Sequence, residues 1–178
     1  MTGLPPEGDF EIVSLNVSDR TGVRKKPVDS VRLVAGSGIA GDAHAFKEGV
    51  AGYENRQVSL LAVEEIEAAS AVLAAKAGCP GYGDEPGGAP AAPRVLVPGD
   101  FAENITTRGL ALHELPLGTR IEAGGAVLEV SKIGKECHAA CEIRRLVGDC
   151  VMPRKGIFVR VIEGGEVSSG SRCHYRIG

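Results

Sequence analysis

The chain has 178 residues, a formal net charge of −3 and a pI of about 5.8, which fits one domain with a sizeable buried core. No run of like charges is longer than the triplet 24–26, so the charge pattern does not indicate a surface for DNA or RNA. The 25 glycines and the absence of tryptophan favour a fold in which short strands turn often.

The first ten residues do not have the pattern of a secretory signal. They carry Pro, Glu and Asp where a signal peptide needs a basic and then an apolar segment, and no apolar run has membrane-spanning length. We therefore expect a cytoplasmic protein without a membrane span. Five cysteines, an odd number, argue against a disulfide framework and predict reduced thiols.

Alternating apolar residues predict the first strands of the chain. Strands are expected at residues 10–18 and 31–35, with residues 24–27 as an exposed loop between them. Residues 36–44 contain three glycines, which indicates positive φ angles or close backbone approach. This run lacks the Gly-Lys-Ser/Thr ending of a phosphate-binding Walker A loop, and we do not expect a dinucleotide-binding G-x-G-x-x-G loop either, so nucleotide binding is not expected.

The middle of the chain predicts one long helix. A strand at residues 56–61 leads into a helix at 62–77, where apolar residues recur on one helical stripe between Val63 and Leu73. The following segment, residues 78–93, is rich in Gly, Pro and Ala and has no periodicity. We interpret it as a surface insertion and expect it to be mobile.

The second half of the chain predicts further strands. Residues 98–107 pass from a turn into a strand, and their polar side chains are expected to face a cleft. Two hairpins and a last strand are expected at residues 120–123 with 126–133, 157–162 with 166–167, and 172–177. Because there is no regular βαβ alternation, the predicted fold is mainly β, a largely antiparallel barrel with peripheral helices.

The segment 134–142 holds two thiols four residues apart, Cys137 and Cys141, with His138 between them. Apolar residues over 143–147 predict a short helix that begins close to Cys137. The backbone N–H groups of a helix N-terminus, with Lys135 and a protonated His138, would lower the pKa of the Cys137 thiol. On spacing alone, the alternative that these cysteines are small buried hydrophobes stays open.

Several segments in this order resemble the MOSC domain, which is named for the C-terminal part of molybdenum-cofactor sulfurases. They are residues 38–44 followed by 56–58, residues 98–106, and the Cys137 segment. Residues 152–158 are also similar to short, stand-alone bacterial members. The resemblance implies a single domain over residues 1–178, with a closed β-barrel core of the pyruvate-kinase barrel type.

The resemblance also implies a role in molybdenum-cofactor chemistry. Cys137 matches the family's cysteine, which is proposed to carry sulfur as a persulfide or to ligate the metal. Since one MOSC-like unit would fill these 178 residues, we expect them to hold no pyridoxal-phosphate-dependent desulfurase domain of the kind found in full sulfurases. The expected partners are therefore a separate cysteine desulfurase as sulfur donor and a molybdenum enzyme or cofactor-biosynthesis protein as recipient.

We assign candidate site residues from this resemblance and from side-chain chemistry. Cys137 is the candidate catalytic residue, and Cys137 and Cys141 are candidate metal ligands. Candidate residues for binding molybdenum cofactor are His44, Arg56, Asn104, Lys135, His138 and Arg154. Arg56 is suited to phosphate because its guanidinium donates two parallel hydrogen bonds. The alternative for both Arg56 and Asn104 is a structural role. Arg56 would then cover apolar surface, and Asn104 would form hydrogen bonds with buried backbone groups.

The sequence is compatible with two other functions. One is a molybdenum-dependent reductase of N-hydroxylated compounds with Cys137 as a metal ligand, which would need separate redox partners. The other is a small zinc site made by Cys137, Cys141 and either His138 or His44. Zinc accepts these ligands, although the usual C-x-x-C and H-x-x-x-H spacings are missing.

Overall fold

The computed structural model describes residues 3–45, 51–77, 95–134 and 150–178. The predicted insertion at 78–93 and the predicted helix after Cys137 lie outside the described residues. Within the described part, no helix is long and apolar enough to cross a membrane.

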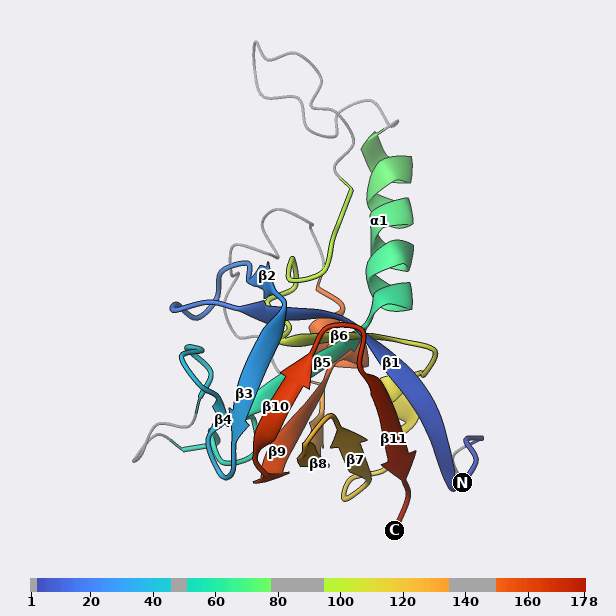
Figure 1. Cartoon of the computed structure of the whole chain (residues 1–178). Helices are drawn as coiled ribbons and strands as arrows, with labels where there is room; N and C mark the ends of the chain where they lie inside the picture. Colours follow the sequence, from blue (N-terminus) through green and yellow to red (C-terminus); the bar gives the residue numbers. More distant parts are fainter. Residues whose placement is uncertain (1–2, 46–50, 78–94, 135–149) are drawn as a thin grey trace.

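Seven strands close a barrel in the order β11-β7-β8-β9-β5-β6-β1, because β1 pairs with β11 as well as with β6 (Figure 1). Their bounds are β1 Glu7–Val17, β5 Val58–Ala62, β6 Ile105–Arg108, β7 Arg120–Ala123, β8 Ala126–Ile133, β9 Ile157–Glu163 and β11 Arg172–Arg176. All these pairings are antiparallel except the one between β5 and β6. The predicted closed, mainly antiparallel barrel is therefore confirmed.

A second, three-stranded sheet lies beside the barrel, in the order β10-β3-β4. It consists of β3 Ser30–Val34, β4 Gly38–Ile39 and β10 Gly165–Ser168. The predicted hairpin of residues 157–162 with 166–167 is therefore wrong, because β10 pairs with β3 and not with β9. In this arrangement Val167 lies opposite Val31, and both side chains are buried in the main core.

The segment 24–27 also differs from the prediction of an exposed loop. Lys26–Val28 forms strand β2, which pairs with the end of β1. Lys25, directly before it, is buried. A sequence prediction places a lysine outside by default, because burying its charge without a partner is costly. Here the partner comes from a distant part of the chain.

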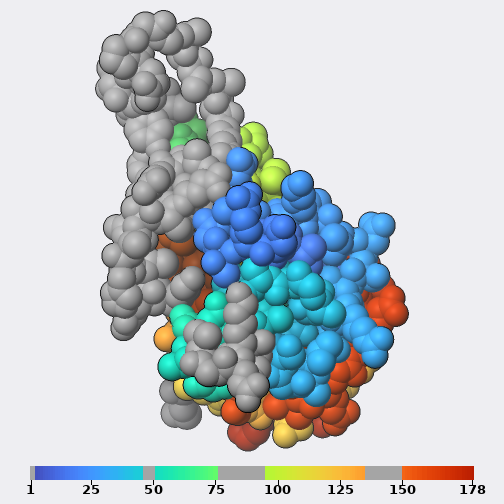
Figure 2. All heavy atoms as spheres, turned by 90° about the vertical axis from the view of Figure 1, so that its left-hand side faces the viewer, coloured from blue at the N-terminus to red at the C-terminus, as the bar shows by residue number. Residues whose placement is uncertain are grey.

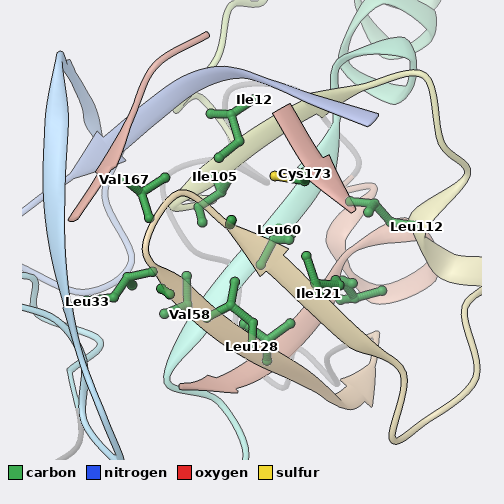
Figure 3. Close-up of a cluster of buried hydrophobic side chains, with 14 of the residues drawn as sticks. Ile12, Leu33, Val58, Leu60, Ile105, Leu112, Ile121, Leu128, Val167 and Cys173 are labelled. Atoms are coloured by element: carbon green, nitrogen blue, oxygen red, sulfur yellow. The ribbon is translucent and has the colours of Figure 1, made fainter. Parts of the chain in front are cut away.

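Two hydrophobic clusters explain why β5 is buried along its whole length. Val58 and Leu60 point into the barrel, where Figure 3 shows them among side chains from β1, β6, β7 and β8. Leu61 packs in the second cluster with Ile66 of helix α1 (Val63–Ala77). Since successive side chains of a strand point to opposite faces, β5 serves both clusters.

Two shorter helical elements complete the fold. They are the 3-10 helix η1 (Leu112–Glu114) and helix α3 (Met152–Lys155). Met152 joins the second cluster, whereas Leu112 packs in the barrel core. Helix α1 rises from the end of β5 and projects beyond the barrel in Figure 1. The helices thus lie at the periphery of the barrel, as predicted.

Cys173 of β11 points into the barrel core (Figure 3). Burial raises the pKa of its thiol to about 12. Since the thiolate is the reactive form, only about one Cys173 in ten thousand would be ionised at pH 8. We predict that iodoacetamide at pH 8 leaves Cys173 unmodified in the folded protein and modifies it in urea, as measured by peptide mass mapping. Equal labelling in both states would contradict the closed barrel.

Candidate functional site

The glycine-rich segment 36–44 forms the turn between β3 and β4 and the chain that follows. Gly36, Gly38 and Gly41 all have positive φ, as expected from their number. Gly38 must be glycine, because a Cβ there would lie 2.5 Å from the carbonyl oxygen of Gln57. These glycines have the G-x-G-x-x-G spacing of dinucleotide-binding loops, yet β3 and β4 are antiparallel and no strand-to-helix turn is formed. The segment instead brings the half-buried His44 to a pocket.

The turn before β5 carries Arg56. Its backbone N–H donates to the carbonyl of Tyr53 (3.0 Å), and its Nε donates to the carbonyl of Gly52 (3.0 Å). Ser131, at an irregularity in the β8–β9 pairing, donates its hydroxyl to the carbonyl of Asn55 (2.9 Å). Bulges often lie next to functional sites because they reorient a strand locally. The turn is thereby tied to the barrel wall.

His44 and Arg56 line one pocket of about 230 Å³, together with Thr21, Tyr53 and Phe158. The left-hand side of Figure 1, which carries β2, β3 and β4, faces the viewer in Figure 2. His44 and Arg56 are both half-buried, so each side chain is held by the protein and still reaches the pocket. A guanidinium and an imidazole beside the half-buried ring of Tyr53 suit an anionic group attached to a flat ring.

A buried ion pair lies directly behind His44. Both carboxylate oxygens of Asp42 lie 2.6 Å from Nζ of Lys25, and the two side chains are 1% and 0% exposed. Asp42 also accepts from the backbone N–H of Ser18 (3.0 Å) and of His44 (2.9 Å). Burial alone would raise the pKa of the Asp42 carboxyl, but Lys25 and these two donors outweigh it and hold the pKa below its usual value.

The polar residues of segment 98–107 do not face a cleft, so that prediction is wrong. Glu103, Asn104, Thr106 and Thr107 are all 0% exposed. The Asn104 side chain accepts from the backbone N–H (3.2 Å) and hydroxyl (3.0 Å) of Ser59, and it donates to the carbonyl of Asn16 (3.3 Å). Asn104 therefore links β5 to β1, and it does not line the pocket of His44 and Arg56.

Glu103 organises the turn that precedes β6. Its carboxylate accepts from the backbone N–H groups of Gly99 (2.6 Å) and Phe101 (3.1 Å) and from the hydroxyl of Thr106 (2.8 Å). Complete burial raises the pKa of Glu103 above its usual value, against the lowering effect of these donors. Its hydrogen bonds serve the backbone of the turn rather than a ligand.

The other predicted site residues fall into two groups. Arg154 is exposed on α3 and is not among the residues that line the pocket. Lys135, Cys137, His138 and Cys141 lie outside the described residues. Within the described part, no group of three His, Cys, Asp or Glu side chains is arranged to hold a metal ion. The predicted roles of the two cysteines therefore stay predictions.

Sequence reasoning did not identify Thr21, Tyr53 or Phe158 as pocket residues. Tyr53 had a weak signal, because it lies three residues before Arg56 in a segment dense in turn-forming residues. Phe158 is the last residue of the segment 152–158 that resembles the family, although nothing there indicated a pocket, and Thr21 had no signal. The pairing of Lys25 with Asp42 was missed because the two residues lie on different segments of the chain.

Solved structures confirm the fold. The YuaD protein of Bacillus subtilis is 20% identical, with a TM-score of 0.71, and the match covers 97% of this chain and 98% of that one. YiiM of Escherichia coli is 16% identical, with a TM-score of 0.62 and coverages of 94% and 69%. YiiM of Geobacillus stearothermophilus is 21% identical, with a TM-score of 0.62 and coverages of 93% and 74%. A comparison with functionally curated proteins found no match.

The family can be assigned from the sequence itself. The profile of the MOSC domain matches residues 47–174, which is well over half of the chain. The matched region runs from the segment just before the Arg56 turn to β11, so it includes most of the barrel and the Cys137 segment. Together with the barrel topology, this match establishes that the chain belongs to the MOSC domain family.

Proposed function

We propose that this protein binds molybdenum cofactor, or its pterin precursor, and handles sulfur or the metal through Cys137 during cofactor maturation. The observation that carries the proposal is the convergence of His44 and Arg56 in one pocket of a MOSC-family barrel. Both residues were predicted as cofactor-binding from separate motifs. The family's association with molybdenum cofactor supports the assignment of the ligand class.

The residues of the pocket fit the phosphate end of such a ligand. Arg56 offers a guanidinium fork and His44 an imidazole, and both can donate to phosphate oxygens. The half-buried ring of Tyr53 can stack or pack edge-on against a planar pterin, whereas Phe158 is 2% exposed and packs in the second hydrophobic cluster. The volume of about 230 Å³ is below the usual range for a whole drug-sized ligand. We therefore assign the phosphate and part of the ring system to this pocket.

Cys137 follows the end of β8 by four residues in the sequence. Strand β8 contributes Ser131, which holds the Arg56 turn, and the described chain continues to Gly134, three residues before the thiol in the sequence. Bound molybdenum cofactor supplies a metal with sulfur ligands. The thiolate of Cys137 attacks the outer sulfur of a persulfide on a cysteine desulfurase, and the donor's S–S bond breaks. The donor leaves as a thiolate, and no net oxidation occurs.

We place this activity in the cytoplasm, where thiols stay reduced between transfer events. The recipient of the sulfur would be a molybdenum enzyme or a cofactor-biosynthesis protein. If Cys137 instead ligates the metal, the protein would function as a molybdenum-dependent reductase with separate electron donors. Sulfur transfer would leave a persulfide sulfur on Cys137, whereas metal ligation would leave a pterin-molybdenum adduct on the protein.

Intact mass spectrometry tests the proposal. The protein is expressed in a molybdenum-competent host, with and without a cysteine desulfurase and cysteine, and is measured under native and denaturing conditions. We expect a gain of one sulfur atom that a reductant removes, absent in Cys137→Ala and retained in Cys173→Ala. A pterin-molybdenum adduct lost in Cys137→Ala would assign the metal-ligand role. Retention of zinc alone would contradict both molybdenum functions.

Arg56→Gln separates the pocket from the thiol. We expect this variant to retain about tenfold less pterin than the wild type, because a charge-assisted pair of hydrogen bonds is lost. Pterin is measured by its fluorescence after oxidation of the denatured protein. Sulfur loading from the desulfurase should be unchanged in the same variant. Equal pterin content in Arg56→Gln and wild type would contradict the assignment of phosphate to this pocket.

A further inference from the structure

Asp42 connects the two segments that bring His44 and Thr21 to the pocket. Its Oδ1 accepts from the backbone N–H of His44, and its Oδ2 accepts from the backbone N–H of Ser18, three residues before Thr21. The next residue, Ala43, also donates its backbone N–H to the carbonyl of Ser18 (2.8 Å). The 18–21 and 42–44 segments are thus held side by side by one carboxylate and one backbone hydrogen bond.

The charge of Asp42 would oppose an anionic ligand if it stood alone. Oδ1 of Asp42 lies 3.8 Å from Nδ1 of His44, which is too long for a hydrogen bond but close for two charges. Lys25, fully buried against both carboxylate oxygens, offsets this charge. The carboxylate can therefore anchor two backbone segments without making the pocket acidic.

Resting on the proposed function, we propose that Asp42 is a positioning residue for anion binding, acting through its hydrogen-bond acceptors while Lys25 neutralises its charge. His44 touches the ligand, and Asp42 does not. The role differs from a purely structural one, because the orientation of the His44 backbone and of the Thr21 segment sets the donors of the pocket. The role also differs from an electrostatic one, because removing the charge alone should leave binding intact.

Two double variants separate the acceptors from the charge. Lys25→Met with Asp42→Asn keeps one of the two acceptor oxygens, whereas Lys25→Met with Asp42→Ala has the same charge and neither acceptor. The probe is inorganic phosphate, titrated while the imidazole proton signals are followed by NMR. The chain has only four histidines, and His44→Gln assigns the signal of His44. We expect phosphate affinity within about threefold of wild type for the first double variant and at least tenfold weaker for the second.

Stability is controlled separately. Ile12→Val destabilises the barrel core without touching the pocket, so its phosphate affinity should equal that of the wild type. If the alanine double variant fails to fold, the asparagine double variant still tests the inference, because it leaves no unpaired charge buried. A phosphate affinity at least tenfold weaker than wild type in the folded asparagine double variant would overturn the acceptor role.

The results also distinguish this inference from the function on which it rests. Wild-type protein that does not bind phosphate at His44 would contradict the pocket assignment itself. Normal wild-type binding, with equal affinity in both double variants, would overturn the positioning role alone. A His44 signal that shifts with phosphate in the asparagine double variant and not in the alanine one supports it.

Discussion

Replacing Lys25 by methionine will lower the free energy of unfolding by about 3–5 kcal/mol at neutral pH, because Asp42 is left as an unpaired buried carboxylate. The two side chains are 0% and 1% exposed, so water does not screen the loss. Urea denaturation followed by far-UV circular dichroism measures the effect, since the chain has no tryptophan to report by fluorescence.

Arg160→Met provides a matched control on the barrel surface. Arg160 pairs with Glu129 across β9 and β8, and its side chain is 45% exposed. Exposed pairs typically contribute about 1 kcal/mol or less, so Arg160→Met should change stability little. A similar small cost for Lys25→Met would contradict the burial of the Lys25–Asp42 pair. The double variant Lys25→Met with Asp42→Asn should recover part of the loss, because no charge remains buried.

The pH dependence follows from the lowered pKa of Asp42. In the wild type, the stability from this group is fully present above the usual aspartate pKa of about 3.9 and is lost as pH falls through the lower folded value. In Lys25→Met the pKa of Asp42 in the folded protein is higher than in the wild type. Burial still raises this pKa, and the Lys25 charge that lowered it is gone. The deficit of the variant should therefore be largest at neutral pH and shrink on acidification.

The barrel could be predicted from the sequence because its strands follow local patterns. The β7–β8 hairpin was predicted at its observed bounds, since apolar alternation on both sides of Gly124-Gly125 fixes the turn and the register. The β9–β10 connection has the same appearance in the sequence and does not form a hairpin. There the partner of β10 is β3, more than 130 residues earlier in the chain, and no local pattern encodes that choice.

The candidate site could likewise be predicted only in part from the sequence. The sequence motifs identified His44 and Arg56, which the fold brings to one pocket. Asn104 lies in an equally distinctive motif, yet its amide bonds to Ser59 and Asn16. A polar residue in a motif can serve a ligand or a buried backbone group, and which one it serves depends on long-range packing. The burial of Lys25 could not be predicted because its partner, Asp42, lies on a different segment.

The glycine of the 98–106 motif, Gly99, lies in close contact with the backbone of Lys25. A side chain at this position should therefore destabilise the protein strongly. Gly99 has φ +89°, and a Cβ there would overlap the carbonyl oxygen of Lys25. The Gly99 carbonyl accepts from the backbone N–H of Lys25 (2.9 Å). We predict that Gly99→Ala costs about 2–6 kcal/mol, the sum of positive-φ strain and steric overlap. Equilibrium urea denaturation measures this cost.

Gly118→Ala isolates the overlap from the strain. Gly118 has φ +85°, close to that of Gly99, but a Cβ added there would meet no atom within 4 Å beyond its chain neighbours. This control should cost about 1–3 kcal/mol from strain alone. If both variants lose equal stability, the Gly99 contact does not constrain the turn. If Gly99→Ala loses more, the motif's glycine is required by the close approach of the backbone that carries Lys25.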